Sequence, residues 1–161
     1  MMPRQYMKFE GGAGKVQNLI GLAPTNNGST LLGLSTLVSQ LNRFGVTQAI
    51  AGQAIAQWTA GSDFVNRLNA GGDTLPGVNY TVIATKYDQV VTPYQSAFLE
   101  AGPGATVNNI TLQNGCAIDA SDHLGIVNSP RAIYYVQKAL DPQYRNGILD
   151  IVPCTFRAPG V

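Results

Sequence analysis

Residues 80–94, which read YTVIATKYDQVVTPY, constrain the fold more than any other part of the sequence. The segment 80–85 is rich in β-branched and aromatic residues and contains neither Gly nor Pro. Such a run is typical of a strand that is buried on both faces of a parallel sheet. The run stops at Lys86, and Asp88 follows two residues later. The pattern therefore predicts a central strand with Asp88 at its carboxyl end.

Further elements alternate along the chain in a way that indicates a parallel sheet. Strands are also predicted over residues 16–23 and 106–113, and helices over residues 1–9, 63–69 and 130–140. Ser62 and Ser129 stand where N-caps are expected, and Pro130 fits the first position of its helix. Strands that alternate with helices favour an α/β fold, here with about three parallel strands and flanking helices.

The polar residues that follow the strands predict a site. In open α/β sheets, ligands and chemistry collect at the carboxyl edge of the strands. Asp88 is expected at this edge, and the only histidine, His123, lies in a polar segment after the strand predicted for residues 106–113. An Asp followed later by a His is the order of the last two members of the Ser, Asp, His triad of α/β hydrolases. We therefore expect Asp88 and His123 to meet at one edge of the sheet.

The length of 161 residues suits one domain with one core. Residues 31–72 are predicted to form a cap-like helical excursion, and the Pro-rich residues 143–161 an extended tail. The strand over residues 16–23 is expected at an exposed edge of the sheet. An unpaired edge favours association of two copies into a homo-oligomer.

Charge and hydropathy exclude several kinds of partner. The formal net charge of +1 gives no clustered cationic surface for nucleic acid. No window approaches the ~18 consecutive apolar residues of a membrane span. The start, MMPRQYMKFEGG, lacks the apolar core of a signal peptide, so we expect no export signal in these residues.

The cysteines leave two alternatives open. Cys116 and Cys154 either form a disulfide in an oxidising compartment or remain two thiols. Their spacing matches no metal pattern, and one histidine offers no ligand cluster. We therefore expect neither a metal ion nor another cofactor.

Five segments also carry a family resemblance. They read MMPRQYMKF, LIGLAPTNNGST, AGSDFVNRLNAGGDTLPGVNYTVIATKYDQVVTPY, NNITLQNGC and SDHLGI. In this order they resemble the carboxyl-terminal half of a secreted actinobacterial triacylglycerol lipase with an α/β-hydrolase fold. The resemblance runs over almost the whole chain.

The resemblance implies a function and roles for individual residues. Asp88 would be the acid of the triad and His123 the general base, acting outside the cell on an ester or acylglycerol. In such lipases a nucleophile elbow of the type G-H-S-x-G-G stands directly before the Met-Met-Pro-Arg stretch, so this sequence would be truncated just after it. The family also has a cysteine near Ile55 that pairs with the counterpart of Cys116, so the resemblance implies that Cys116 has lost the partner expected from the family.

The nucleophile is the missing part of this expectation. The sequence contains no G-x-S-x-G. Ser29, in the turn-rich loop TNNGST, is the preferred substitute, and a purely structural role in the turn is its alternative. We expect weak or residual hydrolysis of short-chain esters. The alternative is a non-catalytic half-hydrolase that binds either acyl chains or a partner subunit, and this partner would supply the missing half.

Overall fold

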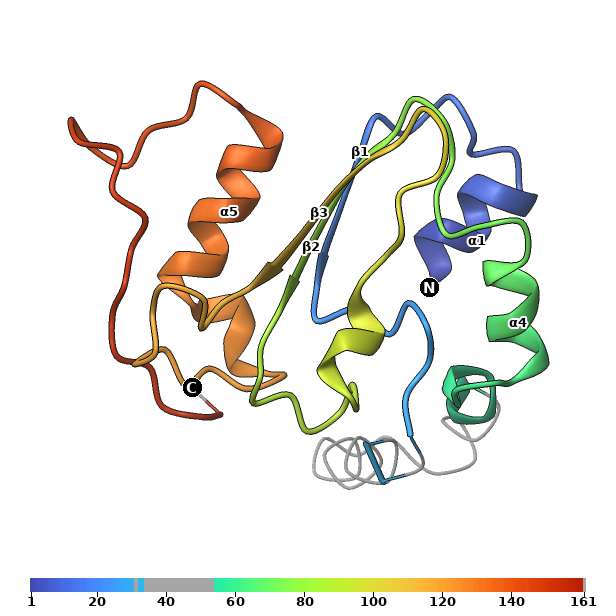
Figure 1. Cartoon of the computed structure of the whole chain (residues 1–161), viewed down its shortest axis with the longest axis horizontal. Helices are drawn as coiled ribbons and strands as arrows, with labels where there is room; N and C mark the ends of the chain where they lie inside the picture. The colour runs from blue at the N-terminus through green and yellow to red at the C-terminus, as the bar shows by residue number, and fades with distance from the viewer. Residues whose placement is uncertain (31, 34–53, 161) are drawn as a thin grey trace.

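The computed structural model describes residues 1–30, 32–33 and 54–160. A central sheet is flanked by helix α5 on one side and by helices α1 and α4 on the other (Figure 1). Much of the excursion expected over residues 31–72 lies outside the described residues. Among its described residues, 32–33, 54–58 and those of α4 are helical.

The sheet has three parallel strands in the order β1-β2-β3, which confirms the predicted fold class. Their bounds are Asn18–Leu22 for β1, Asn79–Ala84 for β2 and Thr106–Thr111 for β3. Leu22 lies opposite Ile83, and Ala84 opposite Thr111. Because the three strands end together, the loops that follow them leave the sheet from the same edge.

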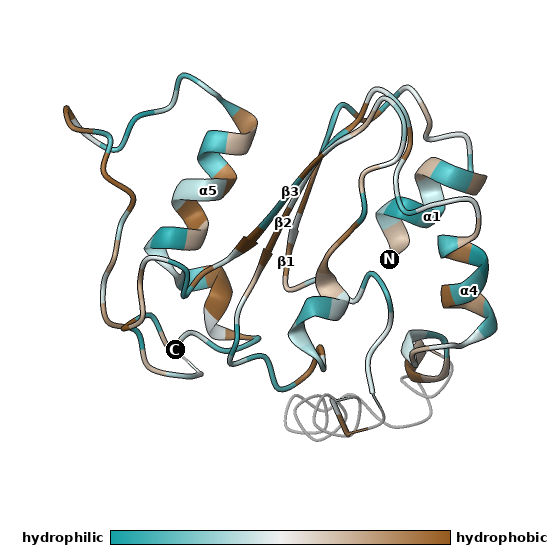
Figure 2. Cartoon of the chain, viewed as in Figure 1, coloured by the Kyte–Doolittle hydropathy of each residue, from teal (hydrophilic) through white to brown (hydrophobic). Residues whose placement is uncertain are grey.

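Strand β2 is buried on both faces, as its residue types predict. On one face Tyr80 and Val82 belong to a cluster with Met7 of α1. On the other face Ile83 packs with Ala132 of α5 and other buried side chains. Figure 2 shows the resulting hydrophobic colouring of the strands between the two helical layers. The buried side chains therefore form two clusters, one on the α1 side of the sheet and one on the α5 side.

Two of the helices begin directly after the capping residues Ser62 and Ser129, as predicted. Helix α1 spans Met2–Phe9, α4 spans Asp63–Asn69 and α5 spans Pro130–Leu140, with short 3₁₀ helices at Tyr94–Ala97 and Gly125–Asn128. The Ser62 hydroxyl accepts the Val65 N–H, and the Ser129 hydroxyl accepts the Ala132 N–H. Within the described ranges, no helix combines the length and apolar character needed to cross a bilayer.

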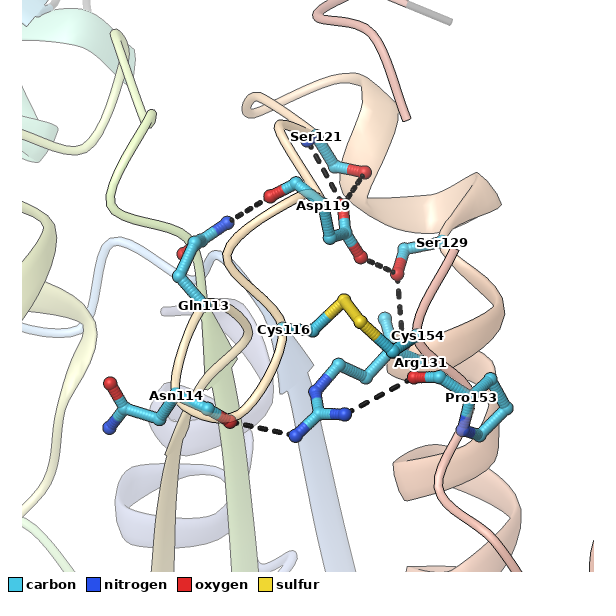
Figure 3. Close-up of a disulfide and its surroundings, with 10 residues drawn as sticks. Gln113, Asn114, Cys116, Asp119, Ser121, Ser129, Arg131, Pro153 and Cys154 are labelled. Atoms are coloured by element: carbon cyan, nitrogen blue, oxygen red, sulfur yellow. Dashed lines mark hydrogen bonds between the residues drawn. A yellow bond between two sulfur atoms is a disulfide. The ribbon is translucent and has the colours of Figure 1, made fainter. Parts of the chain in front are cut away.

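A disulfide joins the tail to the loop after β3 (Figure 3). Cys116 and Cys154 are bonded at 2.03 Å, which resolves the two open alternatives in favour of the disulfide. Cys116 thus lacks the partner that the resemblance gives it, a cysteine near Ile55, but it is not unpaired. The partner comes from the tail instead of from the region near Ile55. Residues 143–160 contain no helix or strand, and their link to the body includes an isolated bridge between Arg157 and Asp119.

Candidate active site

Asp88 is held by the turn that follows β2. Its Oδ1 accepts the backbone N–H groups of Val90 at 2.9 Å and Val91 at 2.7 Å. The Asp88 N–H donates to the Thr85 carbonyl, which closes the turn at the end of the strand. The Asp88 side chain is 1 % exposed. A buried carboxylate needs such donors, and here they fix the direction in which it points.

The structure brings His123 against this carboxylate. The Nδ1 atom of His123 lies 3.0 Å from both Oδ1 and Oδ2 of Asp88. Asp88 comes from the loop after β2 and His123 from the loop after β3, so the shared edge of two neighbouring strands brings them together. The His123 side chain is 20 % exposed. The imidazole is thus bonded to the carboxylate and still reaches solvent.

Gln89 connects the two loops a second time. Its Oε1 accepts the backbone N–H of His123 at 3.3 Å, and its Nε2 donates to Asp122 Oδ2 at 2.8 Å. One side chain therefore binds both the backbone of His123 and the carboxylate of the residue before it. Sequence reasoning missed Gln89, and its place directly after Asp88 is the signal that could have indicated it.

Asp122 shapes the loop that carries His123. Its Oδ1 accepts the N–H groups of Leu124 at 3.2 Å and Gly125 at 2.8 Å. Burial by itself raises the pKa of Asp122, but hydrogen bonds from Gly125, Gln89, Gly160 and Leu124 outweigh it and lower the pKa below its ordinary value. Because the folded pKa is lowered, Asp122 stabilises the loop above the ordinary Asp range, and this stability is lost as the pH falls through the folded pKa.

Buried polar contacts also fix the His123 loop to the sheet. The Thr85 hydroxyl at the end of β2 donates to the Ser121 carbonyl at 2.6 Å, and Gln113 Nε2 donates to the Asp119 carbonyl at 2.8 Å. Asp119 in turn accepts the hydroxyls of Ser121 and Ser129, as Figure 3 shows. The position of the imidazole therefore depends on β2, on the loop after β3 and on the start of α5.

Ser29 packs against the turn that holds Asp88. Its side chain is fully buried, and its hydroxyl donates to the Val90 carbonyl at 2.5 Å. The same hydroxyl accepts the Thr92 N–H at 3.0 Å. These two bonds fix the backbone of residues 90–92, whose first two N–H groups bind Asp88. The contacts support the structural alternative for Ser29, because its hydrogen is directed at Val90 and not at His123.

The contact between Asp88 and His123 allows the imidazole to transfer a proton. A carboxylate that accepts Nδ1–H holds the imidazole in one tautomer and leaves Nε2 as a proton acceptor. Within the described part of the chain, Nε2 has no hydrogen-bond partner. The imidazole can therefore take a proton from a hydroxyl or water on its solvent side and return it later.

Two hollows lie elsewhere on the molecule. One of about 740 Å³ is open and lined by both polar and apolar groups, among them Asn69, Asp73 and Phe98. The other, of about 120 Å³, lies between α1 and β1 and is lined mostly by apolar groups such as Leu19 and Ile20. Neither is lined by Asp88 or His123. In the described ranges no three His, Cys, Asp or Glu side chains gather to hold a metal ion.

Comparisons with known proteins bear on the fold. No protein-family model and no curated protein matches the sequence. Among solved structures, the chain is similar to the crystal structure of Aspergillus fumigatus lipase B, with a TM-score of 0.66 and 23 % sequence identity. The match covers 85 % of this chain and 33 % of that one, so this chain spans about a third of the length of the lipase. The likeness establishes a lipase-like α/β-hydrolase fold.

Proposed function

We propose that this chain carries the acid and the general base of a carboxylic-ester hydrolase of the lipase or esterase type. Asp88 is the acid and His123 the base. The observation that supports this most is the contact of His123 Nδ1 with both Asp88 oxygens at 3.0 Å. The lipase-like fold supports the same reaction class. The substrate is an ester or acylglycerol, cleaved without a metal ion or another cofactor.

The reaction follows from the positions of the two groups. Asp88 holds the tautomer in which Nδ1 carries the hydrogen, so Nε2 accepts the proton of the attacking hydroxyl. Asp88 then stabilises the charged imidazole while the tetrahedral intermediate exists. His123 returns the proton to the leaving alkoxide, which separates as the alcohol. Water then attacks the acyl group that remains on the nucleophile, and His123 accepts its proton in the same way. The carboxylic acid is released and the nucleophile regains its proton.

The nucleophile has two candidate sources, Ser29 and a serine of another polypeptide. Attack by Ser29 requires its hydroxyl to leave the Val90 carbonyl and approach Nε2, so the buried position favours weak activity on short-chain esters at most. A serine supplied by another polypeptide would face no such restriction. Both versions use Asp88 and His123 in the same roles.

The place of action is also part of the proposal. The Cys116–Cys154 bond supports an oxidising compartment, because such bonds are rare where thiols are kept reduced. This agrees with an extracellular protein of the secreted actinobacterial lipase type. Mass spectrometry of the disulfide in protein collected from the culture medium of its source would test this.

Nitrophenyl esters of short acyl chains provide the test of the reaction. We expect slow release of nitrophenol by the purified chain and loss of that release in His123→Ala. Gln143→Ala, in the exposed tail, is the matched control and should keep the full rate. Equal rates for the purified chain and His123→Ala would overturn the proposal.

A second candidate is a non-catalytic subunit that binds acyl chains or pairs with a chain supplying further strands. Strand β1 supports it, because β1 lies at the edge of the sheet beside the mostly apolar hollow of about 120 Å³. Fluorophosphonate labelling with peptide mapping separates the candidates. Labelling of Ser29 that is lost in His123→Ala supports the first, and no labelling supports the second. Labelling only after a polypeptide containing a nucleophile elbow is added supports a composite enzyme.

A further inference from the structure

One part of the tail runs beside the loop that carries His123. We call residues 154–160 the tail strap. The Ala120 N–H donates to the Arg157 carbonyl at 3.0 Å, and the Arg157 N–H donates to the Ile118 carbonyl at 3.3 Å. Figure 1 shows the tail strap, in red, beside the loop that follows β3. The tail strap is therefore bonded to the segment that leads to His123.

The tail strap also reaches the residue before the imidazole. The backbone N–H of Gly160 donates to the carboxylate of Asp122, which directly precedes His123. The same carboxylate accepts the Gln89 amide at 2.8 Å and the Gly125 N–H at 2.8 Å. The tail strap thus supplies one of the donors that fix Asp122 and, through the chain, the position of His123.

Hydrogen bonds by themselves hold the tail strap weakly. Its side chains are half-buried or exposed, and none of the core side chains that the structure describes belongs to it. A few hydrogen bonds at the surface do not offset the entropy that is lost when such a segment is ordered. The disulfide supplies the missing constraint, because it fixes Cys154, the first residue of the tail strap, to Cys116 in the loop after β3.

The tail before Cys154 has anchors of its own. The Asp150 carboxylate accepts the Tyr134 hydroxyl at 3.2 Å and the Lys138 ammonium at 3.0 Å, and both donors belong to α5. Figure 3 shows Arg131 beside the disulfide, where its guanidinium donates to the Pro153 carbonyl at 3.2 Å. None of these contacts involves the tail strap. Opening the disulfide is therefore expected to free the tail strap while the rest of the tail stays on α5.

The two bonded cysteines differ in their access to solvent. Cys154 is exposed, whereas Cys116 is 2 % exposed. A dithiol reductant therefore attacks the sulfur of Cys154 and forms a mixed disulfide there, and Cys116 leaves and takes up a proton. The second thiol of the reductant then displaces Cys154 as a thiol. Two electrons and two protons pass to the protein, and the reductant leaves as a cyclic disulfide. A disulfide oxidant reverses the exchange.

We propose that the Cys116–Cys154 bond is an oxidation-dependent latch on the pair formed by Asp88 and His123. With the bond closed, the tail strap holds the His123 loop so that the imidazole stays against Asp88. With the bond opened by a dithiol, the tail strap leaves and this contact loosens. The effect on ester hydrolysis rests on the proposed function, whereas the effect on the imidazole does not. The pair is thus assembled only where thiols are oxidised.

NMR of the full chain with ¹⁵N-labelled histidine tests the latch through the hydrogen on Nδ1 of His123. We expect an Nδ1–H signal with the bond closed and its loss in dithiothreitol, because the hydrogen then exchanges faster with water. Oxidised glutathione, added after removal of dithiothreitol, should restore the signal. Hydrolysis of short nitrophenyl esters should fall at least about tenfold on reduction and recover with the signal. Circular dichroism should stay unchanged throughout, and global unfolding on reduction would overturn the proposal.

Two substitutions of Arg157 test the tail strap with the disulfide intact. Arg157→Pro removes the N–H that binds the Ile118 carbonyl, whereas Arg157→Ala keeps it and is the matched control. We expect a weaker Nδ1–H signal in Arg157→Pro and an unchanged one in Arg157→Ala. The double variant Cys116→Ser, Cys154→Ser should resemble the reduced chain and should not respond to dithiothreitol.

The outcomes separate the latch from the proposed reaction. An Nδ1–H signal that survives reduction, or equal signals in the two Arg157 variants, would overturn the latch. Hydrolysis that continues unchanged in dithiothreitol would also overturn it and would leave the proposed function intact. A signal that follows the state of the disulfide in a chain without ester hydrolysis would support the latch and contradict the proposed function.

Discussion

Two turns in this molecule are each organised by one carboxylate, and they present opposite chemistry. Asp88 accepts two backbone N–H groups and is almost wholly buried, and it directs its oxygens at His123. Asp150 accepts one backbone N–H and two side-chain donors, and it is more exposed. The turn of Asp88 places a polar imidazole at the edge of the sheet, whereas the turn of Asp150 places aliphatic side chains in water. In both places one carboxylate fixes the backbone of a turn. The Asp88 turn positions the imidazole of His123, whereas the Asp150 turn holds exposed aliphatic side chains.

Replacing the buried carboxylate is expected to have the largest effect. Asp88→Asn keeps the shape of the side chain but removes the charge that holds the Nδ1–H tautomer. We expect the release of nitrophenol from short-chain esters to fall by at least about a hundredfold. Asp150→Asn serves as the matched change in the other turn and should leave this rate within about twofold of the unchanged chain. Equal losses in the two variants would remove the distinction between the turns.

The Cys116–Cys154 disulfide joins the loop that leads to His123 to the tail that contains Asp150. We therefore expect its loss to destabilise both segments. Cys154→Ser opens a crosslink with a sequence separation of 38 residues, and chain entropy assigns about 4 kcal/mol to a loop of this length. Chemical denaturation monitored by circular dichroism measures the change in the free energy of unfolding. Cys116 is buried and would be left as a free thiol, so Cys116→Ser, Cys154→Ser is the control. A loss below about 1 kcal/mol in both would show that the tail is held without the bond.

Ser29 tests whether the turn of Asp88 needs support from below. Ser29→Ala removes a buried hydroxyl with two backbone partners, so we expect a loss of stability of about 1–3 kcal/mol. Ester hydrolysis should also fall, because the N–H groups that hold Asp88 are less well placed. Ser62→Ala, which removes the cap of α4, should cost about 1 kcal/mol without changing hydrolysis. Unchanged hydrolysis in Ser29→Ala would contradict both a positioning and a nucleophilic role.

The smallest effect is expected from protonation of the exposed turn. A hydrogen bond from the Asn146 N–H, together with Lys138 and Tyr134, lowers the pKa of Asp150 below its ordinary value. The folded pKa lies below the unfolded one, so Asp150 stabilises the turn above the unfolded pKa, and this stability is lost as the pH falls through the folded pKa. Carbon NMR of the Asp150 carboxyl should report the lowered pKa, and the Asn146 amide should exchange faster below it. An Asp150 that titrates at the ordinary Asp value would show that the turn is not held by this carboxylate.

Elements that depend on local sequence could be predicted. The apolar run of β2 and the caps Ser62 and Ser129 act through neighbouring residues, and they define elements that the structure confirms. The chain order of strands was enough to predict that Asp88 and His123 meet at one edge. Their catalytic roles remain a proposal.

Non-local contacts could not be predicted in the same way. Arg4 looks like an exposed residue of a surface helix, yet it is 2 % exposed and bonds to Asp73, Asn69 and the Asn26 carbonyl. The sequence offered the Cys116–Cys154 disulfide only as one of two alternatives, because the path of the tail has no periodic pattern. In each case the contact joins segments that are far apart in the sequence and share no local pattern.

Nitrogen NMR of His123 tests the central claim most directly, because the chain has one histidine and its signals need no assignment. With ¹⁵N-labelled histidine, at a pH where the imidazole is neutral, we predict that Nδ1 carries the hydrogen and Nε2 does not. In Asp88→Asn the ring should shift towards a mixture of the two tautomers. The same spectrum in both proteins, or a hydrogen on Nε2 in the unchanged chain, would contradict the account of Asp88 as the group that prepares His123 for proton transfer.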